Sequence, residues 1–302
     1  MDIAPATTRV ITPPRTPTAL TTSAHKLVSE IRDIYDRLSS LPSLAPGPQI
    51  NGLLTRLVNL CIKPFSVEFT KCFFSINGVA HLCEQLRPLC ASAEGELEKF
   101  WATQIIREAQ SALCPSPKLL ASFPYHQNYI DLSRLECLTL EAFLPAPPHK
   151  IAFIGSGPLP LTSLCMLDRH PKAAVHNIDR DAAALNISRQ LCASLGYGSM
   201  SFACEDITKN SNTDWESFEV IFLAALVGTN TDSKMAILSS LASRLRPGTL
   251  VVARSAQGMR SVLYPVLELS VELERTGLEV LVEVHPWTKV VNSVVVMKVK
   301  KR

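Results

Sequence analysis

The 302-residue sequence predicts an α/β fold in two parts, an N-terminal all-helical domain followed by a domain built on a parallel sheet. From residue 25 to about residue 120, apolar residues recur at the spacing of one helix face. After Pro147 and Pro148, short β-rich segments alternate with helical ones, which is typical of βαβ units. The predicted divisions are a disordered tail (1–24), a helical domain (25–118) and a sheet domain (119–302).

The composition predicts a protein with a large core and excludes some classes of partner. Hydrophobic residues make up 47% and charged residues 19%, and the net charge of +3 is too small and dispersed for nucleic-acid binding. No apolar run reaches the ~18 residues of a membrane span, and no secretory signal is recognisable. The nine cysteines lack zinc-site spacing and are predicted to be reduced core residues, so we expect no metal site and a cytosolic location.

The helical domain is predicted from repeated apolar stripes. Residues 1–24 are rich in Thr and Pro without helical periodicity, which favours disorder over the alternative of a transit peptide. Apolar stripes from Leu27 to Leu38 and from Ile50 to Val58 predict two helices, and prolines separate them. Two more are predicted over 79–89 and 91–113. The apolar surface of this half would suit a homodimer.

The sheet domain is predicted from seven β-rich segments. The first five, "IAFIG", "AVHNID", "MSFACED", "EVIFLAAL" and "TLVVARS", are expected to be parallel. The last two, "LEVLVEV" and "NSVVVMKV", are joined by a segment too short for a crossover helix, so they should be antiparallel. Five parallel strands closed by such a hairpin outline the Rossmann-like fold of S-adenosylmethionine-dependent methyltransferases. A six-stranded parallel dinucleotide fold would lack the hairpin.

A glycine turn follows the first predicted strand, at the edge where open α/β sheets bind ligands. Gly155, Ser156 and Gly157 supply a tight turn and close backbone approach, which predicts contact with a nucleotide. Pro160 stands where the dinucleotide motif has its third glycine, so the motif is incomplete. A bare G-x-G turn does not by itself distinguish NAD from S-adenosylmethionine, but the terminal hairpin favours S-adenosylmethionine.

Two carboxylates follow the next strands. Asp179 ends the second strand, 24 residues after Gly155, and is predicted to accept both ribose hydroxyls. Asp206 follows the third strand and is predicted to bind the adenine amino group. The alternative for each residue is a local role as a helix cap.

The helical half offers polar residues on a face that should be buried. At 100° per residue, Glu94, Glu98, Trp101 and Ile105 fall within about 60° of one another, whereas Glu96 lies on the opposite face. A buried carboxylate needs a partner, so either this stripe borders solvent or the two acids meet a cation such as a substrate amine.

The segment "FPYHQNY" lies just before the sheet domain. Tyr125 and Tyr129 stand at helical spacing, which more often indicates core packing than a site. The polar neighbours, Asn128 among them, instead favour a segment that closes over a ligand.

In their order along the chain, several segments together resemble the nicotianamine synthase family. They are "AEGELE", "FPYHQNY", "IAFIGSGPLPLTS", "HNID", "FLAALVG", "RSAQGMRSVLYP" and "HPWTKVVNSVVVMK", and the resemblance begins at about residue 25. It implies an enzyme that uses S-adenosylmethionine as substrate, with no tightly bound cofactor. The enzyme would transfer the 3-amino-3-carboxypropyl arm and release 5′-methylthioadenosine. Three substrate molecules would condense to nicotianamine, a metal chelator, so the metal would bind the product.

The resemblance also implies roles for particular residues. Either Glu94 or Glu98 would deprotonate the attacking amine. Other residues would orient the amine and carboxylate (Tyr125, Asn128, Tyr129), border the sulfonium (Ala224, Ala225, Leu226) or bind product carboxylates (Arg254, Arg260, His285). Gln257 stands where the family pattern has histidine, which bears on the product site.

Two alternative functions fit parts of the pattern. A small-molecule methyltransferase would share the glycine turn, Asp179 and the hairpin. A nonenzymatic sensor of an adenosyl ligand would use the helical half as an interaction module. The acids outside the nucleotide domain favour the transferase.

Overall fold

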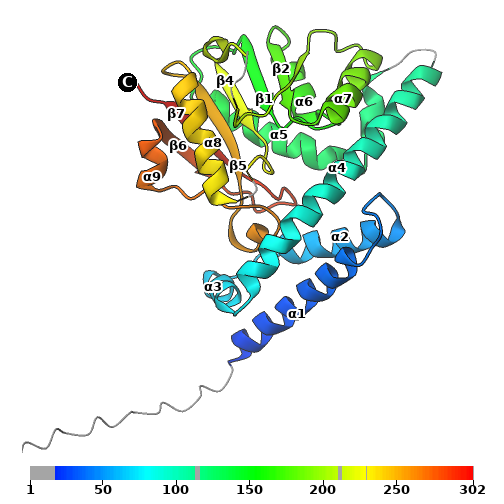
Figure 1. Ribbon diagram of the computed structural model, residues 1–302, viewed down its shortest axis with the longest axis vertical. Coiled ribbons are helices and arrows are strands. Elements are labelled where there is room, and N and C mark those ends of the chain that lie inside the picture. Colours follow the sequence, from blue (N-terminus) through cyan, green and yellow to red (C-terminus); the bar gives the residue numbers. More distant parts are fainter. Residues whose placement is uncertain (1–17, 113–115, 210–212, 229, 302) are drawn as a thin grey trace, which may run out of the picture.

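The computed structural model describes residues 18–112, 116–209, 213–228 and 230–301, and it confirms the predicted fold class (Figure 1). Within those ranges, seven strands form one sheet in the order β3-β2-β1-β4-β5-β7-β6. The first five are parallel, and β7 pairs antiparallel with both β5 and β6, as the short connection predicted. The strands are β1 (Lys150–Ile154), β2 (Ala174–Asp179), β3 (Ser201–Cys204), β4 (Val220–Leu223), β5 (Leu250–Ser255), β6 (Leu278–Val284) and β7 (Ser293–Val299).

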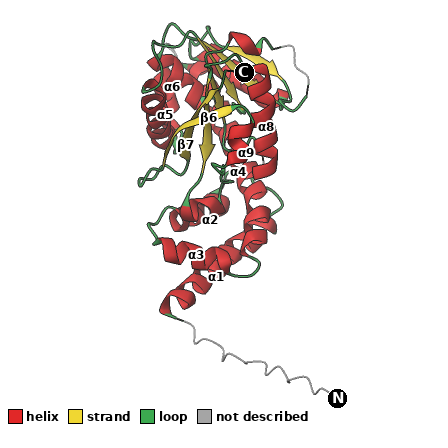
Figure 2. Cartoon of the chain, turned by 90° about the vertical axis from the view of Figure 1, so that its left-hand side faces the viewer, coloured by secondary structure: helices red, strands yellow, loops and turns green. Residues whose placement is uncertain are grey.

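Helices precede the sheet and cover both of its faces. They are α1 (Ala19–Ser39), α2 (Pro48–Cys61), α3 (Val67–Ser75), α4 (Val79–Ser111), α5 (His126–Glu141), α6 (Leu161–Arg169), α7 (Ala182–Ser194), α8 (Thr231–Arg244) and α9 (Val271–Arg275). Short 3-10 helices are η1 (Pro117–Ser122), η2 (Trp215–Ser217) and η3 (Gly258–Val262). Figure 2 shows α5 and α6 on one face of the sheet and α8 and α9 on the other. In the described ranges, no helix combines the length and apolar character needed to cross a membrane.

Strand alternation produces the two cores of the sheet domain. In β1, Ile151 and Phe153 point toward α5 and α6, while Ala152 and Ile154 point toward α8. Successive strand residues face opposite sides of a sheet, so a fully apolar strand such as β1 can fill both cores. This leaves the carboxyl ends of β1, β2 and β4 at one edge, where side chains from their loops converge.

Helix α4 belongs to two hydrophobic cores. Near its start, Leu82 and Leu86 pack with α1, α2 and α3, whereas Ile105 and Ile106 near its end pack against the sheet domain. Its 33 residues span about 50 Å, from the helical half to the sheet (Figure 1). The change from one core to the other therefore lies inside this helix, not at residue 118, where the sequence had placed a boundary.

Two predicted helix boundaries differ from the structure. The break expected near residue 90 is absent, because α4 continues through Pro88. A proline inside a helix removes one backbone hydrogen bond, but packing of both halves of α4 in the two cores holds the helix together. At the N-terminus, α1 begins at Ala19, so the predicted tail ends too late; the Thr18 hydroxyl caps the helix by accepting a bond from the Thr21 N–H at 3.2 Å. Residues 1–17 lie outside the described residues.

Candidate active site

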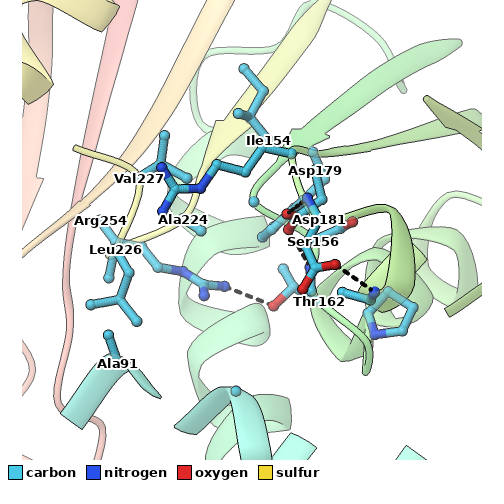
Figure 3. Close-up of a pocket in the computed structure, with 18 of the residues that line it drawn as sticks. Ala91, Ile154, Ser156, Thr162, Asp179, Asp181, Ala224, Leu226, Val227 and Arg254 are labelled. Atoms are coloured by element: carbon cyan, nitrogen blue, oxygen red, sulfur yellow. Dashed lines mark hydrogen bonds between the residues drawn. The ribbon is translucent and has the colours of Figure 1, made fainter. Parts of the chain in front are cut away.

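A cavity of about 440 Å³ opens at the carboxyl edge of the sheet, where the middle of α4 faces the loops after β1, β2 and β4. Figure 3 shows Ala224, Leu226 and Val227 on one side of this pocket and Asp179 and Asp181 on the other. The helical half and the sheet domain thus both contribute walls. This is the edge at which parallel α/β sheets bind ligands.

The turn after β1 requires glycine at two positions. Gly155 and Gly157 have φ angles of +80° and +64°, in the left-handed region that favours glycine. A Cβ added to Gly155 would lie 2.4 Å from Val227 Cγ2, and one added to Gly157 would lie 2.8 Å from Glu98 Oε2. The missing side chains therefore let the β4 loop and the α4 carboxylate approach the turn.

The carboxylates after β2 and β3 both line the pocket. Asp179 accepts hydrogen bonds from the backbone N–H groups of Gly157 at 2.9 Å and Asp181 at 3.0 Å. Asp179 does not cap α7: the cap is Asp181, whose carboxylate accepts from Ala183 and Ala184. Asp206 accepts hydrogen bonds from the backbone N–H and the hydroxyl of Thr208. Its carboxylate therefore stabilises the local turn and also lines the pocket.

Two glutamates of α4 and two tyrosines form a hydrogen-bonded cluster in the pocket wall. The Tyr129 hydroxyl donates to Glu98 Oε1 at 2.5 Å and lies 3.4 Å from Glu94 Oε1. The Tyr264 hydroxyl donates to the other Glu94 oxygen, Oε2, at 3.1 Å. The wheel calculation placed both acids on the inward stripe, and the structure brings both to the pocket.

The cluster is partly buried in the pocket wall, and its ionisation is shifted accordingly. Burial, together with the negative charge of Glu94, raises the pKa of Glu98 to about 8. Burial also raises the pKa of Glu94, against the opposing effects of the Tyr264 hydrogen bond and the Arg254 charge. Burial raises the pKa values of Tyr129 and Tyr264 well above the usual range, so both phenols remain hydrogen-bond donors at neutral pH. The raised pKa values favour the protonated form of the pair when no cation is near, and an incoming cation would favour the ionised form.

Arg254, at the end of β5, lies in a buried ion pair next to the cluster. Its Nε and Nη2 donate to the two oxygens of Glu136 at 2.8 and 3.0 Å, and Nη2 also donates to Thr162 Oγ1 at 2.7 Å (Figure 3). Both charged side chains are nearly inaccessible, at 10% and 1% exposure. Two nitrogens of the Arg254 guanidinium, which was expected to bind a substrate carboxylate, thus already donate to Glu136 of α5.

The loop after β4 borders the pocket with Ala224, Ala225 and Leu226. The buried Lys234 ammonium of α8 donates to the carbonyl of Ala225 at 2.9 Å and to that of Arg254 at 3.4 Å. Burial, together with the charge of Arg254, lowers the pKa of Lys234 to about 8. The Lys234 ammonium thus links the carboxyl ends of β4 and β5 through hydrogen bonds to their carbonyl groups.

Four predicted substrate-contacting residues lie outside this pocket. Tyr125 is exposed and packs on Phe123. Asn128, one residue before Tyr129, points elsewhere on α5, because consecutive helix residues are about 100° apart. Arg260 donates to the Thr288 carbonyl. His285 contacts Ser293 and Glu283. These four residues do not line the pocket, and their contacts with a ligand stay predictions.

Sequence reasoning missed several pocket residues. Tyr264 lies within the family-like segment "RSAQGMRSVLYP", but its distance along the chain from β5 gave no sign that it reaches Glu94. Asn292, just before β7, and Thr162, in α6, also line the cavity. Both occur in quoted family-like segments, which was the available signal.

The pocket is acidic. Among the described residues, six acidic side chains and two arginines line it: Glu94, Glu98, Asp179, Asp181, Glu205 and Asp206 against Arg180 and Arg254. Such a surface favours a cationic ligand and disfavours the pyrophosphate of a dinucleotide.

Comparison with known proteins identifies related chains. Residues 21–302 match the family model described as nicotianamine synthase protein. Nicotianamine synthase 3 of Oryza sativa subsp. indica is 38% identical over 283 residues, covering 90% of this chain and 78% of that protein. Nicotianamine synthase 3 of Arabidopsis thaliana is 37% identical over 278 residues, covering 90% and 83%.

Solved structures share the fold. The structure of MtNAS in complex with MTA and tNA has a TM-score of 0.76 and 22% identity, covering 91% of this chain and 98% of that one. A glutamate-to-glutamine mutant of MtNAS in complex with S-adenosylmethionine has a TM-score of 0.73 and 22% identity, covering 90% and 98%.

Proposed function

The chain belongs to the nicotianamine synthase family, and we propose that its pocket condenses three S-adenosylmethionine molecules into nicotianamine, releasing 5′-methylthioadenosine. The observation that carries this proposal is the Glu98 carboxylate, which lies against the Gly157 turn and shares the Tyr129 hydroxyl with Glu94. It places a proton acceptor beside the expected position of the substrate.

The pocket wall suits the separate parts of S-adenosylmethionine. Asp206 and Asp179 would hold the adenine amino group and the ribose hydroxyls, and the Gly155–Gly157 turn would approach the adenosyl group closely. The backbone after β4, at Ala224 to Leu226, would border the sulfonium. The excess of acids in the pocket favours a sulfonium and an ammonium over a phosphate-bearing cofactor.

The reaction is a displacement at the carbon that joins the aminocarboxypropyl arm to sulfur. The ammonium of the acceptor first gives a proton to a carboxylate, which frees the nitrogen lone pair. The nitrogen lone pair then forms a bond to that carbon. At the same time the carbon–sulfur bond breaks, and the electron pair of that bond passes to sulfur. The sulfonium becomes the neutral thioether of 5′-methylthioadenosine.

Of the two acids, Glu98 is the proposed base. Its pKa of about 8 is close to neutral pH, which suits proton exchange with an amine. Glu94 accepts from Tyr264 and lies near Tyr129, and these bonds favour its ionised form. Glu94 would therefore hold the substrate cation while Glu98 takes the proton.

The rate should depend on pH through Glu98. Only the ionised carboxylate accepts a proton, so kcat/KM should rise roughly tenfold per pH unit below the pKa and level off above about pH 8. Bound sulfonium favours ionised Glu98, so the kcat profile should level off at a lower pH than the kcat/KM profile. Initial rates of 5′-methylthioadenosine release from about pH 6 to about pH 9.5 measure both profiles. A rate that falls across this range would contradict the assignment.

The reaction itself is tested by incubating the purified protein with S-adenosylmethionine alone and identifying the products by mass spectrometry. Formation of 5′-methylthioadenosine with nicotianamine is the expected result. S-adenosylhomocysteine would instead indicate methyl transfer and overturn the proposal. Ligand binding without turnover would favour the sensor.

We also propose a cytosolic location and a homodimer. All eight cysteines in the described residues are free thiols, which suits a reducing compartment. Imaging of a tagged chain tests the location, and light scattering of the purified protein tests the dimer.

A further inference from the structure

Arg87 is a partly buried arginine of α4 whose side chain bonds to the backbone of a distant segment instead of to an acid. η3 lies beside the first half of α4 (Figure 1). The Arg87 Nη2 donates to the carbonyl of Ser261 in η3 at 2.6 Å, and this is the only hydrogen bond of the side chain within the described residues. The Arg87 guanidinium therefore holds one backbone carbonyl.

The Ser261 carbonyl has no backbone donor, and the sequence explains why. η3 continues as a turn to Tyr264, whose N–H donates to the Arg260 carbonyl at 3.3 Å. The next residue is Pro265, which has no N–H to offer to the Ser261 carbonyl. Ser261 is only 7% exposed, so an unpaired carbonyl there would be costly. Arg87 thus caps the turn that carries Tyr264, as arginines can do at the ends of helices.

Tyr264 is the hydroxyl that Glu94 does not share with another acid. The Tyr129 hydroxyl has one proton to donate, and it lies 2.5 Å from Glu98 Oε1 but 3.4 Å from Glu94 Oε1. The Tyr264 hydroxyl donates to Glu94 Oε2 at 3.1 Å and makes no other hydrogen bond among the described residues. The orientation of the Glu94 carboxylate therefore depends on where the Tyr264 hydroxyl lies.

Helix α4 contacts this turn twice, from one face. Arg87 and Glu94 are seven residues apart, which is only about 20° short of two full helical turns, so their side chains leave the helix on the same side. Arg87 bonds to the Ser261 carbonyl, and Glu94 receives the hydroxyl of Tyr264 three residues further along the turn. The first bond holds the turn against the helix at the place where the second bond forms.

We propose that Arg87 is a positioning residue, which acts on the reaction through Tyr264 by holding the turn that carries it against α4. The Tyr264 bond in turn fixes the Glu94 carboxylate that holds the substrate cation. The inference rests on the proposed function, because that function supplies the cation. Arg87 does not line the pocket, so its effect on the rate passes through Tyr264.

A double-mutant cycle tests whether Arg87 and Tyr264 act together. Arg87→Met nearly keeps the length of the side chain but removes its donors, and it should lower kcat/KM for 5′-methylthioadenosine release about three- to tenfold. Tyr264→Phe should lower kcat/KM about tenfold or more, because it removes a hydrogen bond to a charged group. In the Tyr264→Phe protein, adding Arg87→Met should cost less than about twofold, because the hydroxyl through which Arg87 acts is already gone.

A conservative variant and a matched control complete the experiment. Arg87→Lys should fall between the parent and Arg87→Met, because an ammonium can still donate to the carbonyl but lacks the planar fork of arginine. Arg56→Met removes another arginine of the helical half, one that pairs with acids at the surface, and should leave kcat/KM within about twofold. Thermal unfolding checks that each variant is folded, and Arg87→Lys takes the place of Arg87→Met in the cycle if the methionine variant does not fold.

Two results would overturn the proposal. One is unchanged kcat/KM in Arg87→Met, and the other is an equal loss from Arg87→Met with and without the Tyr264 hydroxyl, which would show a purely structural role. Binding of 5′-methylthioadenosine, which lacks the substrate amine, should change less than about twofold in every variant. Failure of the proposed function is separately visible, because the parent protein would then yield S-adenosylhomocysteine from S-adenosylmethionine before any variant is compared.

Discussion

Replacing Glu98 by glutamine should lower kcat by about 10²- to 10⁴-fold, the usual contribution of a positioned general base. Glutamine keeps the size of the side chain and its place against the Gly157 turn, but it cannot accept the proton of a substrate ammonium. The adenosyl contacts are unchanged, so binding of 5′-methylthioadenosine should be retained. Single-turnover measurement of 5′-methylthioadenosine release separates the chemical step from binding.

The matched control for this change lies on the same helix. Glu96→Gln alters an acid that does not line the cavity, and it should leave kcat within about twofold. The residual rate of Glu98→Gln should also lose its rise with pH near 8, since the group responsible is gone. Normal activity of Glu98→Gln, with loss of activity in Glu94→Gln, would assign the base to Glu94 instead.

Removing Glu136 should produce the largest loss of stability. Arg254 would be left buried without its carboxylate partner, and breaking a buried ion pair in this way costs about 3–5 kcal/mol. Urea unfolding of Glu136→Ala, followed by circular dichroism, should therefore show a clear fall in the transition midpoint.

Glu141→Ala is the control on the same helix α5. Glu141 also receives two hydrogen bonds from one arginine, Arg169, at 2.8 Å each, but that pair is at the surface and should contribute far less. The double change Glu136→Leu/Arg254→Met should recover much of the lost stability, because it removes both charges. Equal losses in Glu136→Ala and Glu141→Ala would contradict the importance of burial.

Much of the fold could be predicted because its signals are local. The alternation of strand and helix segments gave the parallel sheet, and the short link between 278–284 and 293–299 gave the antiparallel closure. The spacing of Glu94 and Glu98 on one helix face was also local, and it led to the pocket. These features depend on periodicity, which a sequence displays directly.

The remaining features depend on contacts between distant segments. Arg254 and Glu136 are 118 residues apart, and nothing in the sequence indicates that one carboxylate occupies the guanidinium fork. Tyr264 reaches Glu94 only because η3 packs beside the helical half. The break predicted between residues 89 and 91 is absent for a similar reason, because packing at both ends of α4 outweighs the hydrogen bond lost at Pro88.

Helix α4 also links the folding of the two halves to ligand binding. Its middle carries Glu94 and Glu98, while its ends are anchored in separate cores. Loss of either core would release one end of the helix and with it the geometry of the pocket. A ligand that binds the two glutamates therefore favours states in which both cores are folded. Its binding free energy stabilises both cores against unfolding. The protein should respond to its substrate as one cooperative unit, not as two separable domains.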